Sequence, residues 1–405
     1  MNKLLVRQFF FTFLFLNLTF LAKCQDAILD TLSIDAETLE PYQRNNKWGF
    51  VDANEKVVID LVYDKTYHFY EGLALVVSNN KWGFINKLGQ VIIPINLENA
   101  YPFSEGLAMI TQEGKYGFID KTGKIAISCI YEDADYFYEG LALVSNNEEY
   151  GFINKLGEVV IPLTYRDADS FSEGLAPVSS KKKYGFINQT GKTVIPFIYD
   201  DAWQFSEGLA AVSKKEKYGY INKKMEIVIP FIYDDAYLFF EGLAFVEKEG
   251  KHGFIDKVGN IVIELEYDKI FRFGEHLPAF YKVKNDNKYG FIDAKGEIVI
   301  PIIYDYISDF FNGYAKIKGD WGYGIINTNG KVVISPKYNY VSYVNKDLVI
   351  VKMYDKYGVI NKKGKVIIPI EYDRVSDFEN GVTKVEKEGE VFYMNEKGEC
   401  IKGCS

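Results

Sequence analysis

The chain has 405 residues, of which 48% are hydrophobic and 25% charged, and this balance excludes a predominantly disordered protein. Acidic side chains outnumber basic ones, 56 to 47, so the formal net charge is −9. An acidic surface repels phosphate backbones, and nucleic acid is therefore not an expected partner.

The first 24 residues have the layout of a cleavable secretory signal. Lys3 and Arg7 provide a positive start, residues 9–22 are mainly apolar, and Ala22 and Cys24 are small residues at the minus-three and minus-one positions. An uncleaved membrane anchor is the alternative, because the apolar run is close to spanning length. We expect cleavage, no membrane span afterwards, and an exported protein in the periplasm, at the cell surface or in the medium.

Residues 25–47 fit no repeat and are expected to form an N-terminal cap or tether. From residue 48 to 390 a phrase of 34 residues is then written ten times, and residues 391–405 form a degenerate half-repeat. An aromatic residue (His in one copy) followed by glycine marks each copy, at steps of 34 with one step of 37. These glycines are Gly49, Gly83, Gly117, Gly151, Gly185, Gly219, Gly253, Gly290, Gly324 and Gly358.

Each copy predicts three or four short antiparallel strands. In the copy that begins at Tyr184, residues 184–188 alternate with period two, and residues 188–192 form a tight turn with Gly191. Residues 193–197 are rich in β-branched side chains and form the return strand. A corner over residues 199–205 leads to the next strand, residues 209–212. The pattern therefore predicts a β-meander without helices.

One such unit buries too little surface alone, so neighbouring units must stack. We expect an all-β open solenoid or superhelical array, because closed propellers have about four to eight blades. The alternative is a propeller-like closed ring or rings, since three or four strands also suit a blade. The glycine after each aromatic is expected to admit the backbone of the adjacent repeat.

The repeated phrase resembles the WG repeat family of β-rich repeat proteins. The resemblance is carried by Tyr184-Gly185-Phe186-Ile187-Asn188, by Tyr199-Asp200 and by Glu207-Gly208-Leu209-Ala210, with Trp48-Gly49 and Trp82-Gly83 retaining the namesake Trp. It covers residues 48 to about 400. It implies a bacterial, often exported β-repeat array with no common catalytic residue and no agreed ligand.

Enzyme signatures are largely missing from the sequence. His68, His252 and His276 lie at unrelated positions of the repeat, so they form neither a metal triad nor a catalytic pair. The glycines are spread singly at turns and do not cluster before a helix as in a phosphate loop. We therefore expect no enzyme and no cofactor.

Two acidic ladders are candidate binding stripes. The first has Glu before Gly and includes Glu139, Glu173, Glu207 and Glu241; the second follows the Tyr corner and includes Asp200 and Asp234. Rows of carboxylates suit calcium or a cationic partner. The alternative is local, because Glu and Asp beside turns can also satisfy backbone amides, and every copy needs its turn.

Aromatic residues near the conserved Phe form a third candidate. Trp203 and Tyr237 would stack on sugars or peptides if exposed, or cover the core if not. Cys129 is expected to pack as a small apolar group. Cys400 and Cys404 are close enough in sequence to pair in an oxidising compartment, which the sequence alone leaves open.

Three functions from different classes remain. The first is an exported, non-enzymatic repeat scaffold that binds a protein or a polymer such as a polysaccharide along an extended face. The second is a structural component of the cell envelope or surface. The third, least favoured, is a carbohydrate-active or hydrolytic enzyme, for which departures from the repeat would have to cluster in the deviant seventh copy.

Overall fold

The computed structural model describes residues 39–54, 56–272, 280–310, 313–343 and 347–403. The predicted signal, residues 1–24, lies outside the described residues, as do residues 25–38 of the predicted cap and Cys404. The chain divides into two compact units, Met1–Leu163 and Thr164–Ser405.

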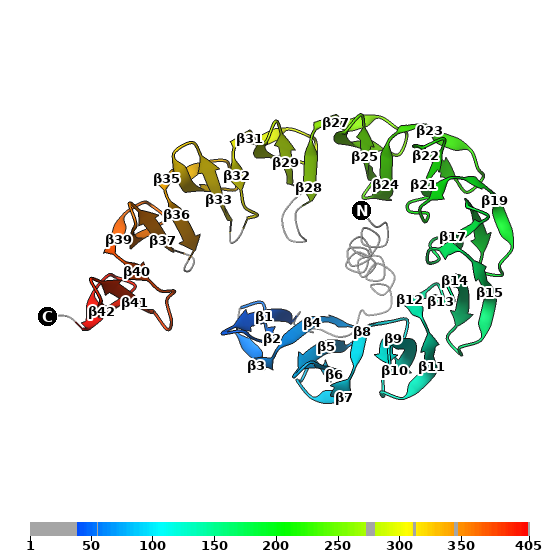
Figure 1. Ribbon diagram of the computed structural model, residues 1–405, viewed down its shortest axis with the longest axis horizontal. Helices are drawn as coiled ribbons and strands as arrows, with labels where there is room; N and C mark the ends of the chain where they lie inside the picture. The colour runs from blue at the N-terminus through cyan, green and yellow to red at the C-terminus, as the bar shows by residue number, and fades with distance from the viewer. Residues whose placement is uncertain (1–38, 55, 273–279, 311–312, 344–346, 404–405) are drawn as a thin grey trace, which may run out of the picture. The chain divides into compact units, whose positions relative to one another are not determined.

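The first unit contains four antiparallel sheets, which we call blades 1 to 4 (Figure 1). Blade 1 has three strands: β1 (Glu40–Arg44), β2 (Lys47–Val51) and β3 (Val57–Tyr63). Blade 2 has β4 (Lys65–Tyr70), β5 (Leu73–Ser78), β6 (Lys81–Asn86) and β7 (Val91–Leu97). Blade 3 has β8 (Asn99–Ser104), β9 (Leu107–Gln112), β10 (Lys115–Asp120) and β11 (Ile125–Tyr131). Blade 4 has β12 (Asp133–Tyr138), β13 (Leu141–Asn146), β14 (Glu149–Asn154) and β15 (Val159–Tyr165), whose last residues cross the unit boundary.

The second unit contains blades 5 to 11, each with four strands in chain order. Blade 5 has β16 (Asp167–Ala168), β17 (Leu175–Ser180), β18 (Lys183–Asn188) and β19 (Thr193–Tyr199); blade 6 has β20 (Asp201–Ala202), β21 (Leu209–Lys214), β22 (Lys217–Asn222) and β23 (Ile227–Tyr233). Blade 7 has β24 (Asp235–Phe240), β25 (Leu243–Lys248), β26 (Lys251–Asp256) and β27 (Ile261–Tyr267); blade 8 has β28 (Lys269–Arg272), β29 (Tyr281–Asn285), β30 (Lys288–Ile292) and β31 (Ile298–Tyr304). Blade 9 has β32 (Tyr306–Ile307), β33 (Tyr314–Gly319), β34 (Gly322–Asn327) and β35 (Val332–Tyr338); blade 10 has β36 (Tyr340–Tyr343), β37 (Leu348–Met353), β38 (Lys356–Asn361) and β39 (Val366–Tyr372). Blade 11 has β40 (Arg374–Val375), β41 (Val382–Lys387), β42 (Glu390–Asn395) and β43 (Cys400–Lys402).

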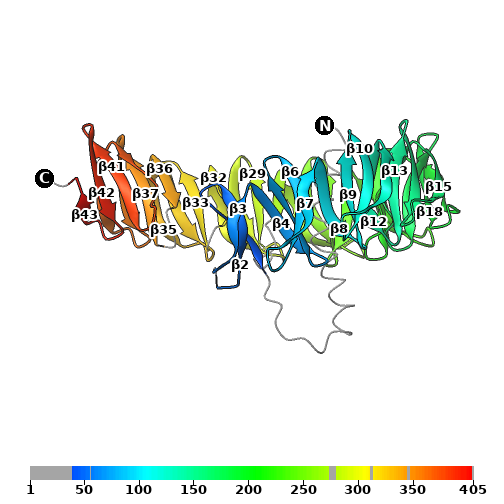
Figure 2. The ribbon, with the colours of Figure 1, turned by 90° about the horizontal axis from the view of Figure 1, so that it is seen from below.

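The expected all-β meander is confirmed, but the open solenoid is wrong. Every sheet of the described chain is complete within three or four consecutive strands, and none of these sheets continues into the next. Within each unit, successive sheets pack through their faces in shared buried clusters, which is how propeller blades meet, so the propeller alternative fits. In the side view of Figure 2, the strands of consecutive blades in the second unit run side by side between two edges.

These two edges carry different turns. Edge A holds the turns that join second to third strands and the links from one blade to the next. Edge B holds the turns that join first to second strands and third to fourth strands. Both edges recur in every four-stranded blade, so a residue's place in the repeat decides the edge at which it lies.

The sequence repeat and the blade are out of phase. The copy that begins at Tyr184 supplies β18 and β19 to blade 5 and then β20 and β21 to blade 6. The core is shared in the same way, because Phe186 and Ile195 of blade 5 pack in one buried cluster with Phe205 and Ile221 from the blade 6 segment. The rings of Phe186 and Phe205 are 4.9 Å apart. Each copy therefore ties two blades together by covalent continuity and by a common core.

The glycine after each aromatic belongs to a β-bulge inside its own sheet. Opposite Gly185, the register of β18 and β19 shifts between Tyr184 and Phe186. A Cβ at Gly185 would lie 2.5 Å from the carbonyl oxygen of Ile195, in the neighbouring strand of the same blade. The expectation that this glycine admits an adjacent repeat is therefore wrong, and the close backbone is that of the fourth strand.

Candidate functional site

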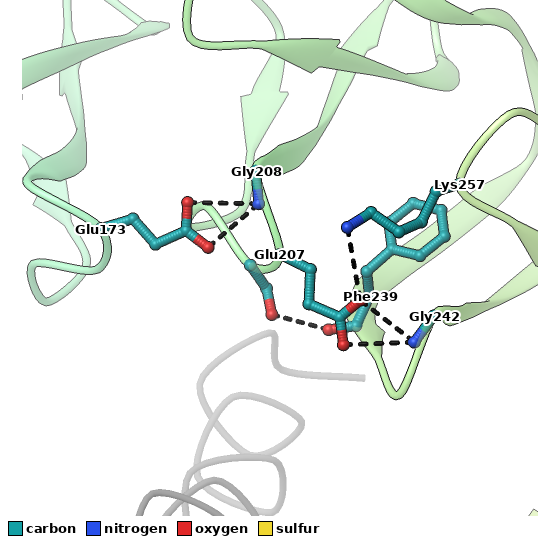
Figure 3. A network of polar contacts seen from close by, with 7 residues as sticks. Glu173, Glu207, Gly208, Phe239, Gly242 and Lys257 are labelled. Atoms are coloured by element: carbon teal, nitrogen blue, oxygen red, sulfur yellow. Dashed lines mark hydrogen bonds and ion pairs between the residues drawn. The ribbon is translucent and has the colours of Figure 1, made fainter. Parts of the chain in front are cut away.

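The first acidic ladder lies at edge B and connects consecutive blades. Glu207 begins the turn between the first and second strands of blade 6 with a φ of 52°. Its carboxylate accepts a hydrogen bond from the backbone N–H of Gly242 in blade 7, with Oε2 and N 3.1 Å apart (Figure 3). Lys257 Nζ of blade 7 lies 3.7 Å from the same oxygen. Glu173 makes the corresponding contact with Gly208 N at 3.0 Å (Figure 3).

The same arrangement recurs in the first unit. Glu71 accepts from Gly106 N at 3.0 Å and lies 3.1 Å from Lys121 Nζ. Glu105 accepts from Gly140 N, also at 3.0 Å. The remaining predicted members, Glu139 and Glu241, occupy the same turn position with φ values of 52° and 50°.

The second acidic ladder lies at edge A and also connects blades. Asp200, in the link between blades 5 and 6, accepts from Lys183 Nζ of blade 5 and, at 2.7 Å, from Lys215 N of blade 6. The side-chain hydrogen bond from Lys183 is the main cause that lowers the pKa of Asp200. Asp234 accepts from Lys217 Nζ, which lowers its pKa, and from Glu249 N at 2.6 Å.

The eight predicted site residues therefore do not form one stripe. The glutamates lie at edge B, and Asp200 and Asp234 lie at edge A. The contacts described for both ladders are to backbone N–H groups and lysines that hold consecutive blades together, and we call these repeated contacts and the common blade backbone the frame. Among the described residues, no group of three or more His, Cys, Asp or Glu side chains could hold a metal ion. Calcium binding by the ladders stays a prediction.

The two predicted aromatic residues do come together. The ring centroids of Trp203 and Tyr237, from neighbouring blades, are 5.9 Å apart, and both side chains are half-buried. The Tyr237 hydroxyl donates to Asp235 Oδ2 at 3.0 Å. Burial raises the pKa of Tyr237 and also that of Asp235.

A row of three positions at edge A changes its chemistry along the chain, and we call it the variable row. It crosses the first, second and third strands of a blade at residues that pair in register. In blades 4 to 6 the row is Asp, Ser and Tyr: Asp133, Ser145, Tyr150; Asp167, Ser179, Tyr184; Asp201, Ser213, Tyr218. In blade 7 it is Asp235, Glu247 and His252. In blades 8 to 10 lysine takes the middle place: Lys269, Lys284, Tyr289; Tyr306, Lys318, Tyr323; Tyr340, Lys352, Tyr357.

In blades 5 and 6 the variable row is closed by its own hydrogen bonds. The Tyr184 hydroxyl donates to Asp167, and the Tyr218 hydroxyl donates to Asp201. Asp201, Ser179 and Ser213 are buried. These rows therefore hold their polar groups inside the blade.

In blade 7 the row brings two carboxylates and a histidine together. His252 Nε2 lies 3.5 Å from Glu247 Oε2, and Nδ1 lies 3.3 Å from the carbonyl oxygen of Tyr267. The imidazole also stacks on Phe245, with ring centroids 5.3 Å apart. Both ring nitrogens therefore face acceptors of the blade itself.

In blades 8 to 10 the lysine at the middle place of the variable row lies over the ring of the tyrosine paired with it. Lys284 Nζ is 5.8 Å from the ring centroid of Tyr289, and Lys318 Nζ is 5.8 Å from that of Tyr323. Lys352 Nζ is 5.3 Å from the ring of Tyr357. The sequence interpretation above missed these lysines. The signal was present as a change from Ser to Lys at one position of the 34-residue period.

The fourth strands carry exposed apolar side chains. They lie on the outer side of the succession of blades in the second unit, as β19 and β23 show in Figure 1. In β19, Val194 and Ile198 are exposed on either side of Pro196. Proline lacks a backbone N–H, so it blunts an edge strand against pairing with another chain.

Three further observations concern single residues and the membrane. Cys129 packs against a buried cluster as predicted, and burial raises the pKa of its thiol. Met225 takes the place of a turn glycine and keeps the turn at a φ of 67°, with its N–H 2.9 Å from Asn222 O. A helix that could span a bilayer is not found in the described part of the chain.

Comparison with known proteins places the chain in a family. Among solved structures it is similar to a eukaryotic initiation factor, with 12% identity, a TM-score of 0.44, and coverage of 74% of this chain and 96% of that one. It is also similar to BamB from Moraxella catarrhalis, with 11% identity, a TM-score of 0.32, and coverage of 74% and 94%. No curated protein matches the chain. The WG containing repeat matches ten times, at residues 48–82, 82–116, 116–150, 150–184, 184–218, 218–251, 253–289, 289–318, 323–357 and 357–390. The chain belongs to the WG containing repeat family.

Proposed function

We propose that this protein is an exported, non-enzymatic scaffold that binds a protein or polymer partner along an extended face of its blades. The observation that carries the proposal is that different positions of the repeat have different roles. The ladder residues make the same contacts between blades in one blade after another, whereas the variable row changes from Asp-Ser-Tyr in blade 6 to Lys-Lys-Tyr in blade 8. In a repeat array, positions that are not needed to hold the repeats together are the ones that can contact a binding partner.

The proposal that the protein is not an enzyme is supported by blade 7. Two departures from the repeat meet there, Glu247 in place of Ser and His252 in place of Tyr, in one row with Asp235. The imidazole is nevertheless held between Glu247, the Tyr267 carbonyl and the ring of Phe245. Such contacts fit a histidine that replaces a structural Tyr better than a catalytic base.

Export and partner binding are tested together. An epitope-tagged full chain, expressed in its own cells, is expected in the periplasmic, surface or secreted fraction after loss of residues 1–24. Isolation from that fraction under mild salt is expected to recover one stoichiometric protein or polymer. Retention of the tagged chain in the cytoplasm would contradict export, and recovery only with insoluble envelope would favour a structural envelope component instead.

A further inference from the structure

We propose that the variable row of blades 8 to 10 binds a linear acidic polysaccharide, with Lys284, Lys318 and Lys352 contacting successive carboxylate groups of the polymer. This proposal rests on the proposed scaffold function and names the ligand class of one of its surfaces.

One lysine–tyrosine arrangement is repeated in blades 8 to 10. The three lysines share one position in the second strand, and each ammonium lies between 5.3 and 5.8 Å from the ring of the tyrosine paired with it on the third strand. The ring faces orient the ammonium groups without neutralising them. Lys318 is exposed, and Lys284 and Lys352 are half-buried, so their charged ends remain within reach of a ligand.

The charge balance around the row also favours an acidic ligand. The neighbouring carboxylates are already used by the frame: Asp268 is 2.7 Å from Lys251 Nζ, and Asp305 is 2.6 Å from Lys288 Nζ. Lys284 and Lys318 form no ion pair in the described part of the chain. The hydrogen bonds from Lys251 and Lys288 are the main causes that lower the pKa of Asp268 and of Asp305, and the charges of Lys284 and Lys318 add to them only as lesser causes. Lys352 pairs with Asp355 at 2.8 Å, but that aspartate side chain is 94% exposed, so the pair is easily exchanged.

One lysine of the second strand in blade 9 extends the positive surface toward blade 10. Lys316 Nζ is 5.8 Å from the rings of both Tyr323 and Tyr340, and it donates to Val341 O at 3.2 Å. In blade 8 the corresponding Lys282 Nζ is 5.1 Å from the ring of Phe271, but its charge is already paired with Asp309 at 2.8 Å. In blades 2 to 6 the corresponding position is apolar, so these lysines are specific to this part of the array.

The spacing of the three lysines selects the class of ligand. Sheets packed face to face lie about 10 Å apart, so the three lysines of the row recur at roughly that interval. Duplex DNA carries one charge every ~1.7 Å, far more densely than the row provides partners. A polysaccharide with one acidic group in every second sugar has widely spaced charges, and its sugar rings can lie on the tyrosine faces between them.

The test compares two triple variants of the full chain. The row variant is Lys284→Ser, Lys318→Ser and Lys352→Ser, because Ser is the natural residue at this position in blades 4 to 6. The control variant removes the same charge at edge B of the same blades, where Lys295→Ser, Lys331→Ser and Lys363→Ser change exposed turn residues. A third variant, with Arg at the three row positions, keeps the charge.

Binding is measured by calorimetric titration with a defined oligouronate of alternating acidic and neutral sugars, with a neutral oligosaccharide and inorganic polyphosphate as further probes. We expect the row variant to lose at least about tenfold in affinity for the oligouronate, and the control and Arg variants to stay within about twofold of the natural chain. Unchanged far-ultraviolet circular dichroism and melting temperature establish that each variant is folded.

Three results would overturn the proposal: no binding of the oligouronate by the natural chain, equal losses in the row and control variants, or stronger binding of polyphosphate than of the oligouronate. If one of these results is found and the row variant still recovers a stoichiometric partner from cells, the polysaccharide proposal is wrong and the scaffold function is retained. Retention of the tagged chain in the cytoplasm together with oligouronate binding that depends on the row would instead contradict the exported scaffold and keep the site.

Discussion

Blades 5 and 6 and blades 8 to 10 of the second unit share one frame but differ in the chemistry placed on it. In blade 6 the variable row is internal, because the Tyr218 hydroxyl is taken by the buried carboxylate of Asp201. In blade 9 the corresponding tyrosine ring, that of Tyr323, instead faces the ammonium groups of Lys316 and Lys318. The same blade fold therefore accommodates an acidic side chain in the variable row of blade 6 and basic side chains in and beside the row of blade 9.

The contacts between consecutive blades differ as well. Blades 6 and 7 are joined at edge B by the Glu207 carboxylate on Gly242 N. Between blades 9 and 10, Lys316 reaches from the second strand to the Val341 carbonyl at 3.2 Å, whereas Ala211 occupies its position in blade 6. Repeats that keep a common backbone can exchange such contacts one blade at a time, which leaves surface positions free to acquire a ligand.

Substitutions that disrupt the β-bulge common to the blades should cause the largest loss of unfolding free energy, and the loss should be equal in both regions. Gly185→Val in blade 5 and Gly324→Val in blade 9 would place a Cβ at 2.5 and 2.4 Å from the carbonyls of Ile195 and Ile334. We expect each to lower the free energy of unfolding by about 3 kcal/mol or more, because backbone atoms on both sides of the bulge must move. Denaturant melts would show it.

A matched control is available in β33. A Cβ at Gly319 would meet only Pro336, at 3.6 Å, so Gly319→Ala should change the free energy of unfolding by less than about 0.5 kcal/mol. A mild effect of valine in one region only would mean that the bulge is not a common element of the frame.

Contacts between blades should show the next largest effect, and there the two regions should differ. Glu207→Ala leaves the N–H of Gly242 without its carboxylate acceptor and is expected to cost about 1–2 kcal/mol of unfolding free energy. Lys316→Leu should stay within about 1 kcal/mol, because Leu75 is the natural residue at that position in blade 2. Chemical denaturation measures both. A larger loss for Lys316→Leu than for Glu207→Ala would reverse the comparison.

Two adjacent aspartates in blade 7 allow a comparison by pH. The pKa of Asp234 is lowered by the hydrogen bond from Lys217, so its ionised form stabilises the fold above pH 3.8 and this contribution is lost as the pH falls through the lowered pKa. The pKa of Asp235 is raised by burial, so its ionised form destabilises the fold at neutral pH and the penalty disappears as the pH falls toward 3.8.

Substitution by Asn should therefore have opposite signs at the two positions. At pH 7, Asp234→Asn should lower the melting temperature. Asp235→Asn should raise it, because the amide keeps Oδ1 for the Ala236 N–H and offers its NH2 group to the oxygen of the Tyr237 hydroxyl. Both differences should shrink toward pH 3. Thermal melts between pH 3 and pH 7 measure this, and shifts of the same sign at neutral pH would contradict the assignment.

The sequence predicted the local elements well, because strand period and turn chemistry act within one copy. Residues 184–188 and 193–197 are strands as expected, and Asn188 and Gly191 form the turn between them. Which strands pair was not predictable in the same way. Tyr184 to Val212 reads as a single meander, and only the long-range packing of Phe186 against Phe205 shows that two sheets share it.

The candidate site was harder to predict for a related reason. The acidic ladders stand out because they recur, and recurrence marks what every blade needs. The row of Lys284, Lys318 and Lys352 stands out only as a departure from Ser, and its cross-strand neighbours follow from the register that the hairpin turns impose. The lysine row is found when the residues at one position of the 34-residue repeat are compared from copy to copy and the strand register is used to identify their cross-strand neighbours.

The smallest expected effects come from the turns at edge A, where both central residues have positive φ. Lys182 in blade 5 and Asp355 in blade 10 are second in such turns, with φ values of 66° and 65°, a position that glycine holds in blade 3 as Gly114. Lys182→Gly should raise the free energy of unfolding by about 0.5–1 kcal/mol, because the left-handed conformation carries no steric cost for glycine. Asp355→Gly removes the same steric cost but loses the ion pair with Lys352, so the net change in unfolding free energy should be close to zero. Chemical denaturation measures both changes.

The same Asp355→Gly variant should bind the oligouronate more tightly than the natural chain, by about two- to threefold, because Lys352 no longer has an ion-pair partner. Calorimetric titration would measure this affinity. Weaker binding after Asp355→Gly would show that Asp355 positions Lys352 and does not compete with the ligand.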